Sequence, residues 1–137
     1  MKSVLFLCVA NSARSQMAEG LARKVFGDTI QFQSAGSKPT AVNPYAVRVM
    51  KEFGVDISSQ RSKPVSEIAE GSFDTAIYLC AEEACPIGFE NVPRRLWQLP
   101  DPAGTLGSDE HILQAFRETR DRLYAKLMSL QKELRPQ

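Results

Sequence analysis

The chain has 137 residues, of which 43% are hydrophobic and 24% charged, and this composition predicts a single globular domain spanning residues 1–137. Seventeen lysines and arginines against sixteen aspartates and glutamates leave a formal net charge of +1, which argues against nucleic acid, a membrane surface or a polyacidic protein as the partner. No apolar run approaches the roughly 20 residues that span a bilayer, and the N-terminal apolar stretch is too short for a signal peptide, so we expect a cytoplasmic protein.

The first half of the chain predicts two strand–helix units. Residues 3–7 form a continuous apolar run, the polar residues 11–15 predict a tight loop, and apolar residues then recur at helical spacing over 17–26. The alternation of residues 30–33 predicts a second strand. Residues 43–54 predict a helix that begins with an asparagine cap and a proline and ends at a glycine.

The second half predicts two further strands and a long helix. Residues 64–70 predict one short helix, residues 73–79 a buried strand and residues 96–99 a weaker strand. Ser108, followed by two acidic residues, caps a helix in which apolar residues recur at three- and four-residue steps as far as Leu134.

Strands separated by helices favour an α/β fold with a four-stranded parallel sheet and helices on both of its faces. In such a sheet, ligands bind at the carboxyl ends of the strands. Cys8, Cys80 and Asp101 directly follow the first, third and fourth predicted strands. We therefore expect these three side chains to lie along one edge of the sheet.

The loop after the first strand combines a cysteine, an arginine and small polar residues. A loop between a strand and a helix directs backbone N–H groups and the positive end of the helix dipole at one point, which is how proteins bind tetrahedral oxyanions. Arg14 would hold the anion with a bidentate fork, and the same field would favour a nucleophilic Cys8 thiolate. The expected binding residues are Val9, Ala10, Asn11, Ser12, Ala13, Arg14 and Ser15. The alternative is a buried strand-end cysteine followed by a solvated arginine.

Three further residues are candidates for catalysis. Asp101 lies between two prolines, where a fixed carboxyl group could protonate a departing oxygen; a plain turn aspartate is the alternative. Cys80 and Cys85 enclose four residues, two of them glutamates that disfavour thiolates, so this pair is better suited to act after Cys8 has reacted. Two unrelated buried cysteines are the alternative. We expect no metal and no cofactor.

With these motifs the chain resembles the arsenate reductases built on the low-molecular-weight tyrosine phosphatase fold, over essentially its whole length. The resemblance rests on Cys8 with residues 14–20, Ser34-Ala35-Gly36, Val42-Asn43-Pro44, Leu79-Cys80 with Cys85-Pro86, and Asp101-Pro102-Ala103-Gly104.

The resemblance implies an enzyme that reduces arsenate to arsenite. Arsenate would be bound by the loop from Cys8 to Arg14 while Cys8 attacks arsenic and Asp101 protonates the leaving hydroxyl. Cys80 would then attack Cys8 and expel arsenite, and Cys85 would attack Cys80 to leave a Cys80–Cys85 disulfide that thioredoxin reduces. The partners implied are arsenate and thioredoxin, and we expect a monomer.

Two departures from the family pattern matter. Thioredoxin-coupled relatives commonly separate the second and third cysteines by more than four residues, so glutaredoxin with glutathione is the alternative reductant. Lys63 stands where some relatives carry an aspartate that helps to bind potassium, with residues matching Asn11, Glu19 and Ser34. We expect the Lys63 ammonium to point into this cavity and pair with Glu19 in place of the ion.

Two other functions compete with arsenate reduction. A low-molecular-weight tyrosine phosphatase needs the same loop and the same aspartate, but it has no use for Cys80 and Cys85. Phosphatases of this fold also carry aromatic residues around the pocket, where this chain has Val9, Ala10 and Ala103. A non-catalytic oxyanion or redox sensor is the alternative of another class, and unlike a reductase it would not consume reductant when arsenate is added.

Overall fold

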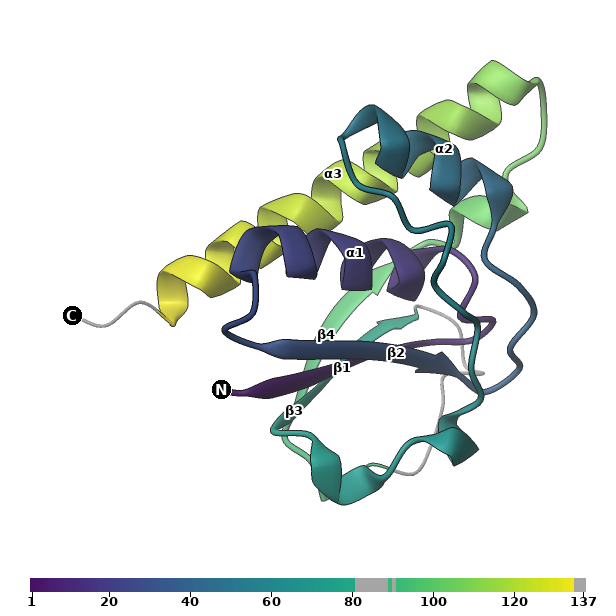
Figure 1. Cartoon of the computed structure of the whole chain (residues 1–137). Helices are drawn as coiled ribbons and strands as arrows, with labels where there is room; N and C mark the ends of the chain where they lie inside the picture. The colour runs from purple at the N-terminus through teal and green to yellow at the C-terminus, as the bar shows by residue number, and fades with distance from the viewer. Residues whose placement is uncertain (81–88, 90, 135–137) are drawn as a thin grey trace.

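A parallel four-stranded sheet forms the centre of the computed structural model, which describes residues 1–80, 89 and 91–134 (Figure 1). The strands follow the order β2-β1-β3-β4 and are all parallel. Their bounds are β1 (Ser3–Cys8), β2 (Gln31–Gly36), β3 (Thr75–Cys80) and β4 (Arg94–Leu99). The predicted α/β class, strand number and parallel arrangement are confirmed.

The burial of each strand follows its place in the sheet. β1 and β3 lie in the interior and are almost wholly buried, which explains why their sequences are continuous apolar runs. β4 lies at an edge, and its first two residues are arginines that are not buried. Because these arginines interrupt the apolar pattern, the sequence predicts only residues 96–99 of this strand.

Three α-helices connect and cover the sheet: α1 (Arg14–Phe26), α2 (Pro44–Glu52) and α3 (Asp109–Glu133). The two expected side-chain caps are present, since Asn43 accepts a hydrogen bond from the Tyr45 N–H and Ser108 accepts one from the His111 N–H. α1 begins at Arg14, earlier than the apolar spacing predicts, and its first nine residues are all buried. The N-terminal end of α1 therefore lies directly against the loop that follows β1.

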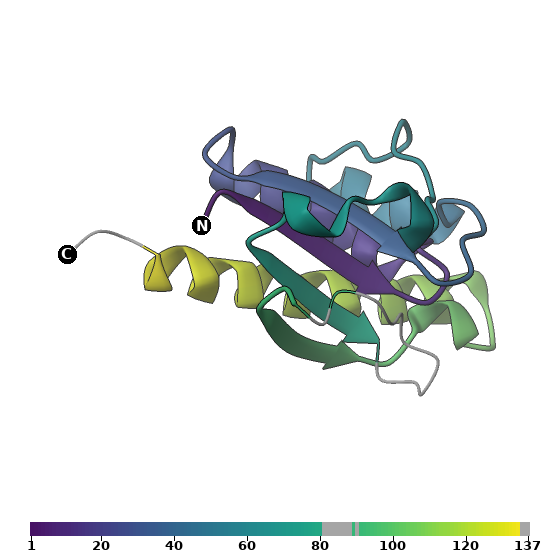
Figure 2. The same ribbon diagram turned by 90° about the horizontal axis from the view of Figure 1, so that it is seen from below.

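The two faces of the sheet are covered differently in the described part of the chain. In Figures 1 and 2, all three α-helices lie on one face, where their apolar side chains join those of β1, β3 and β4 in the larger core. The other face carries a smaller cluster with Val65, Ile68 and Phe73 from the segment that leads into β3. The expected helices on both faces are thus α-helices on one face and single 3-10 turns on the other.

The segment predicted as one helix over residues 64–70 forms two such turns, η1 (Val65–Glu67) and η2 (Glu70–Ser72). Pro64 is extended and forms an isolated parallel bridge with Gly36 at the end of β2. Ile68 and Ala69 are also extended, so they separate the two turns, and Val65 and Ile68 pack against the sheet.

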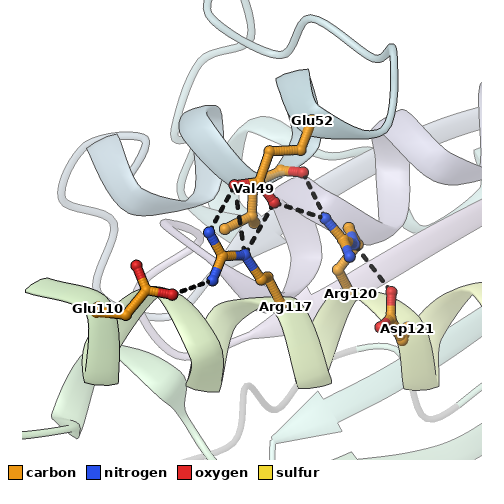
Figure 3. Close-up of polar contacts among 6 residues, drawn as sticks. All are labelled: Val49, Glu52, Glu110, Arg117, Arg120 and Asp121. Atoms are coloured by element: carbon orange, nitrogen blue, oxygen red, sulfur yellow. Dashed lines mark hydrogen bonds and ion pairs between the residues drawn. The ribbon is translucent and has the colours of Figure 1, made fainter.

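An ionic network joins α2 to α3 (Figure 3). Arg117 donates to both carboxylate oxygens of Glu52, at 3.0 and 2.8 Å, and to Glu110 at 2.7 Å. Arg120 donates to the Val49 carbonyl oxygen at 2.9 Å and to Glu52 at 3.2 Å. The hydrogen bonds from Arg117 hold the pKa of Glu52 below its usual value.

This network predicts a pH-dependent contribution to stability. Because the folded-state pKa of Glu52 is depressed, its contribution is present above the pKa of the unfolded chain, about 4.3, and is lost as the pH falls through the lower folded value. We expect Glu52→Gln to lower the melting temperature by a few degrees at pH 7 and to match the parent protein well below pH 4. Glu118→Gln, at an exposed glutamate of α3, is the control; an equal difference at both pH values would contradict the expectation.

No helix in the described ranges has both the length and the hydropathy needed to cross a membrane.

Candidate oxyanion site

The predicted site residues meet at the carboxyl edge of the sheet. β1 ends at Cys8 and β3 ends at Cys80, which pairs with Leu99 at the end of β4. Arg14 Nη2 lies 3.7 Å from Asp101 Oδ2, although 87 residues separate the two in sequence. Cys8 is a buried free thiol, whereas Cys80 is buried and disulfide-bonded. Cys85 lies outside the described residues.

Carbonyl groups of the loop from Val9 to Ala13 accept hydrogen bonds from a neighbouring segment of the chain. Residues 38–43 run alongside it and donate three backbone hydrogen bonds: Lys38 N to Val9 O at 2.9 Å, Thr40 N to Ala10 O at 3.1 Å and Asn43 N to Ser12 O at 2.9 Å. In a trans peptide the N–H points opposite to the C=O, so each of these bonds turns the next N–H toward the inside of the loop. The inward N–H groups and the N-terminal end of α1 form a ready-made cradle for a tetrahedral anion.

Asn11 forms the turning point of this loop. It is fully buried, and it is the one non-glycine residue with a positive φ, 48°, in the part of the chain that the structure describes. Its carbonyl oxygen accepts hydrogen bonds from Ser62 Oγ at 2.6 Å and Gln16 Nε2 at 3.0 Å, and its Oδ1 accepts one from the Lys63 N–H at 2.8 Å. A left-handed conformation persists in a non-glycine residue only when its surroundings fix it, and these three bonds do so.

A short chain of hydrogen bonds leads from Asn11 to the cysteine. Asn11 Nδ2 donates to Ser15 Oγ at 2.7 Å, and Ser15 Oγ lies 2.8 Å from Cys8 Sγ. Because the serine oxygen already accepts from Asn11, its own proton is available to the sulfur. A hydrogen bond donated to the sulfur would suit a Cys8 that acts as a nucleophile.

Arg14 and Asp101 close the site from the β4 side. The Arg14 side chain is only 2% exposed, and its Nη1 donates to the Leu99 carbonyl oxygen at 3.0 Å. The Asp101 side chain is 40% exposed and accepts a hydrogen bond from the Ala103 N–H at 3.0 Å, which caps the 3-10 turn η3 (Pro102–Gly104). Asp101 is therefore a turn aspartate and also faces the site, so the two interpretations of this residue are compatible.

Gly36, at the end of β2, packs against the backbone of the loop. A Cβ atom at this position would clash with the Val9 carbonyl oxygen and lie 2.9 Å from both the Asn11 nitrogen and the Cys8 oxygen. These are main-chain atoms, so relief requires the loop itself to move.

We therefore expect Gly36→Ala to reduce oxyanion binding and catalysis at least about tenfold, because a misplaced N–H group loses much of an oxyanion-hole contribution. Inhibition by inorganic phosphate measures the loss of binding, and a melting curve shows whether the variant is also less stable. Gly71→Ala is the control, since no atom lies within 4 Å of a Cβ added there. Unchanged phosphate inhibition in Gly36→Ala would contradict the role of this contact.

The neighbouring Glu19 is held by a different cation from the one expected. Glu19 is 3% exposed and forms an ion pair with Arg23 at 3.0 Å and a hydrogen bond with Ser34 Oγ at 3.1 Å. Lys63 lines the same cleft of about 620 Å³, but its Nζ donates to the Arg61 carbonyl oxygen at 3.5 Å. Burial lowers the pKa of Lys63. The expected direct pair of Lys63 with Glu19 does not form: Arg23, one helical turn along α1, pairs with the carboxylate, and the Glu19 charge acts on Lys63 from a longer distance.

No group of three or more histidine, cysteine, aspartate or glutamate side chains is placed to hold a metal ion within the described residues. Two residues outside the predicted site, Gln16 and Ser62, also donate hydrogen bonds that fix the loop. Gln16 is fully buried and belongs to the motif after Arg14, whereas nothing in the local sequence distinguishes Ser62.

The chain is similar to known proteins over most of its length. The family model described as low molecular weight phosphotyrosine protein phosphatase matches residues 3–137. An arsenate reductase of Halalkalibacterium halodurans is 42% identical over 124 residues, which cover 89% of each chain, and one of Bacillus subtilis is 39% identical over 128 residues, which cover 92% of each.

Solved structures of similar proteins include an arsenate reductase in the phosphate binding state. It has a TM-score of 0.83 and 33% identity, with 98% of this chain and 100% of that chain covered. A thioredoxin-dependent arsenate reductase of Corynebacterium glutamicum has a TM-score of 0.69 and 28% identity, with 97% of this chain and 63% of that chain covered.

Proposed function

Because the chain belongs to the low molecular weight phosphotyrosine protein phosphatase family, whose loop chemistry needs one cysteine, we propose that its further cysteines make it a thioredoxin-dependent arsenate reductase. The observation that carries the proposal is the position of Cys80 beside Cys8. The two residues end the neighbouring strands β3 and β1, and Cys80 is disulfide-bonded. A phosphatase needs Cys8 alone, whereas reduction of arsenate needs two thiols to supply two electrons.

In the first step the cradle binds arsenate. The inward N–H groups and Arg14 hold its oxygens, and the Cys8 thiolate attacks arsenic to form a sulfur–arsenic bond. The bond from arsenic to one hydroxyl breaks, and Asp101 supplies the proton with which that oxygen leaves as water. The buried Arg14, with five N–H donors in a planar fork, suits a tetrahedral oxyanion better than a lysine would.

In the second step the electrons reach arsenic from the thiols. The Cys80 thiolate attacks Cys8 Sγ, the sulfur–arsenic electron pair stays on arsenic, and arsenite leaves while a Cys8–Cys80 disulfide forms. Cys85 then attacks Cys80, which returns Cys8 as a thiolate and leaves a Cys80–Cys85 disulfide for thioredoxin to reduce. Arsenate and two thiols are thereby converted to arsenite, water and one disulfide.

The sheet register limits how Cys80 can reach Cys8. Leu7 lies opposite Tyr78, so Cys80 is one residue beyond the position opposite Cys8. Neighbouring strands are about 4.8 Å apart and rise about 3.3 Å per residue, which brings the two Cα atoms within the separation that disulfides span. The register of β3 with β4 shifts between Tyr78 and Cys80, so regular alternation does not fix the face on which Cys80 lies. Cys80 is also disulfide-bonded here, so that bond must be reduced before the Cys8–Cys80 bond can form.

A phosphatase activity toward small aryl phosphates is the second candidate, because the family model bears a phosphatase name and the cradle suits phosphate equally well. The residues around the loop offer little for stacking an aromatic substrate, since Val9, Ala10 and Ala103 are small aliphatic residues. We therefore propose that this activity is weak.

We also propose that residues 1–137 form one catalytic domain that works as a cytoplasmic monomer. The family match over residues 3–137 supports the domain assignment. The cytoplasm suits the relay because it keeps thiols reduced and contains thioredoxin.

The test is arsenate-dependent oxidation of NADPH in the presence of thioredoxin and thioredoxin reductase. We expect NADPH consumption only when arsenate, thioredoxin and the protein are all present. The same assay with glutaredoxin, glutathione and glutathione reductase identifies the alternative reductant. A phosphatase or an oxyanion sensor consumes no NADPH in either assay, and that result would overturn the proposed function.

A further inference from the structure

The segment of residues 60–63, here called the strap, runs beside the oxyanion loop and is itself firmly held. In Figure 1 the teal chain between α2 and η1 descends past the N-terminal end of α1 to the tip of β2. Gln60 Nε2 donates to the Gln16 carbonyl and side-chain oxygens at 3.0 and 2.8 Å, and Gln16 Nε2 donates to the Arg61 carbonyl oxygen at 3.1 Å. The Gly36 N–H donates to the Lys63 carbonyl oxygen at 2.9 Å. Both ends of the strap are therefore fixed.

The Asn11 carbonyl differs from the other carbonyls of the loop. Backbone N–H groups hold the carbonyls of Val9, Ala10, Ser12 and Ala13. Side chains hold the carbonyl of Asn11, namely Ser62 Oγ at 2.6 Å and Gln16 Nε2 at 3.0 Å. One peptide of the cradle thus depends on side chains for its orientation, and it follows the single left-handed residue that the described chain places in this loop.

The direction of this peptide decides where the Ser12 N–H points. The Asn11 carbonyl and the Ser12 N–H belong to one planar trans peptide, so a carbonyl drawn toward Ser62 turns the N–H to the inside of the cradle. Without the Ser62 bond, the left-handed Asn11 loses one of the contacts that offset its backbone strain. The peptide can then rotate away from the bound anion.

We propose that Ser62 is a positioning residue for oxyanion binding, which orients the Asn11–Ser12 peptide through its hydroxyl group. The inference deepens the proposed function and rests on it, because it assigns a role in the same cradle. Ser62 touches neither the anion nor Cys8 in this role, and it acts only through the peptide that it holds.

The test compares the binding of inorganic phosphate to the reduced protein by isothermal titration calorimetry. We expect Ser62→Ala to weaken the phosphate Kd about fivefold to tenfold, the value of one lost hydrogen bond. Ser62→Thr keeps the hydroxyl group and is expected to stay within about twofold of the parent protein by the same reasoning. Ser66→Ala, at an exposed serine of η1, is the matched control and should bind like the parent.

A melting curve of each variant separates positioning from folding. If Ser62 has only a structural role, Ser62→Ala melts at a lower temperature but binds phosphate like the parent, and the proposal is overturned. Equal loss of binding in the alanine and threonine variants, or unfolding of the alanine variant at the binding temperature, also overturns it. Phosphate binding does not require turnover, so a failure here is distinct from a failure to reduce arsenate.

Discussion

Replacement of Cys8 by serine is expected to abolish arsenate reduction and aryl phosphate hydrolysis together. Both reactions need a nucleophile that is ionised near neutral pH, and a serine hydroxyl in the same position stays protonated without a strong base beside it. In this site the Ser15 hydroxyl group lies 2.8 Å from the Cys8 sulfur, and a hydroxyl group is too weak a base to ionise a serine. We expect the rate of both reactions to fall by at least about 10³-fold.

Phosphate binding provides the control for this experiment. The inward N–H groups and Arg14 are unchanged in Cys8→Ser, so inorganic phosphate should bind the variant within a few-fold of the parent protein. Cys80→Ser is the matched variant, because it should lose arsenate reduction while it keeps aryl phosphate hydrolysis. Substantial arsenate turnover by Cys8→Ser would refute Cys8 as the nucleophile.

The strands could be predicted because the sheet is simple and its interior strands are buried on both faces. Residues 3–7 and 73–79 are continuous apolar runs for this reason, and the core of each coincides with β1 or β3. The start of the long C-terminal helix could also be predicted, because Ser108 and the two acidic residues that follow it are typical of a helix N-terminus. The segment after Lys63 could not be predicted in the same way. Its conformation depends on the bridge between Pro64 and Gly36, and a contact between residues so far apart in the sequence cannot be predicted from the local pattern.

The site shows the same division between local and distant contacts. The loop from Cys8 to Ser15 was predicted as a unit because its chemistry lies in consecutive residues. The groups that hold it come from far along the chain: the backbone of residues 38–43, the Ser62 hydroxyl group and the Leu99 carbonyl oxygen. Every residue except proline has a backbone N–H group and serine is common, so these contacts cannot be predicted from the sequence. The choice of Arg23 over Lys63 as the partner of Glu19 also depends on side-chain reach rather than on residue type.

The cysteine relay predicts a different trapped state for each of two substitutions. Cys80→Ser removes the thiol that attacks Cys8, so the variant should form the arsenic adduct on Cys8 and fail to release arsenite. Cys85→Ser removes the thiol that resolves the first disulfide, so after one turnover Cys8 and Cys80 should remain joined. Mass spectrometry of unreduced peptides distinguishes an arsenic adduct from a Cys8–Cys80 disulfide. Multiple turnover should be lost in both variants.

The trapped Cys85→Ser state also tests the geometry of the exchange. Cys80 lies one residue beyond the position opposite Cys8 and next to a register shift, so we expect the end of β3 to leave its pairing with Leu99 when this disulfide forms. Hydrogen exchange should therefore be faster at the ends of β3 and β4 in the trapped state than in the reduced variant, with the centre of β1 unchanged as an internal control. If Cys85→Ser instead keeps full thioredoxin-dependent turnover, Cys85 is not part of the relay. Thioredoxin would then reduce the Cys8–Cys80 disulfide directly.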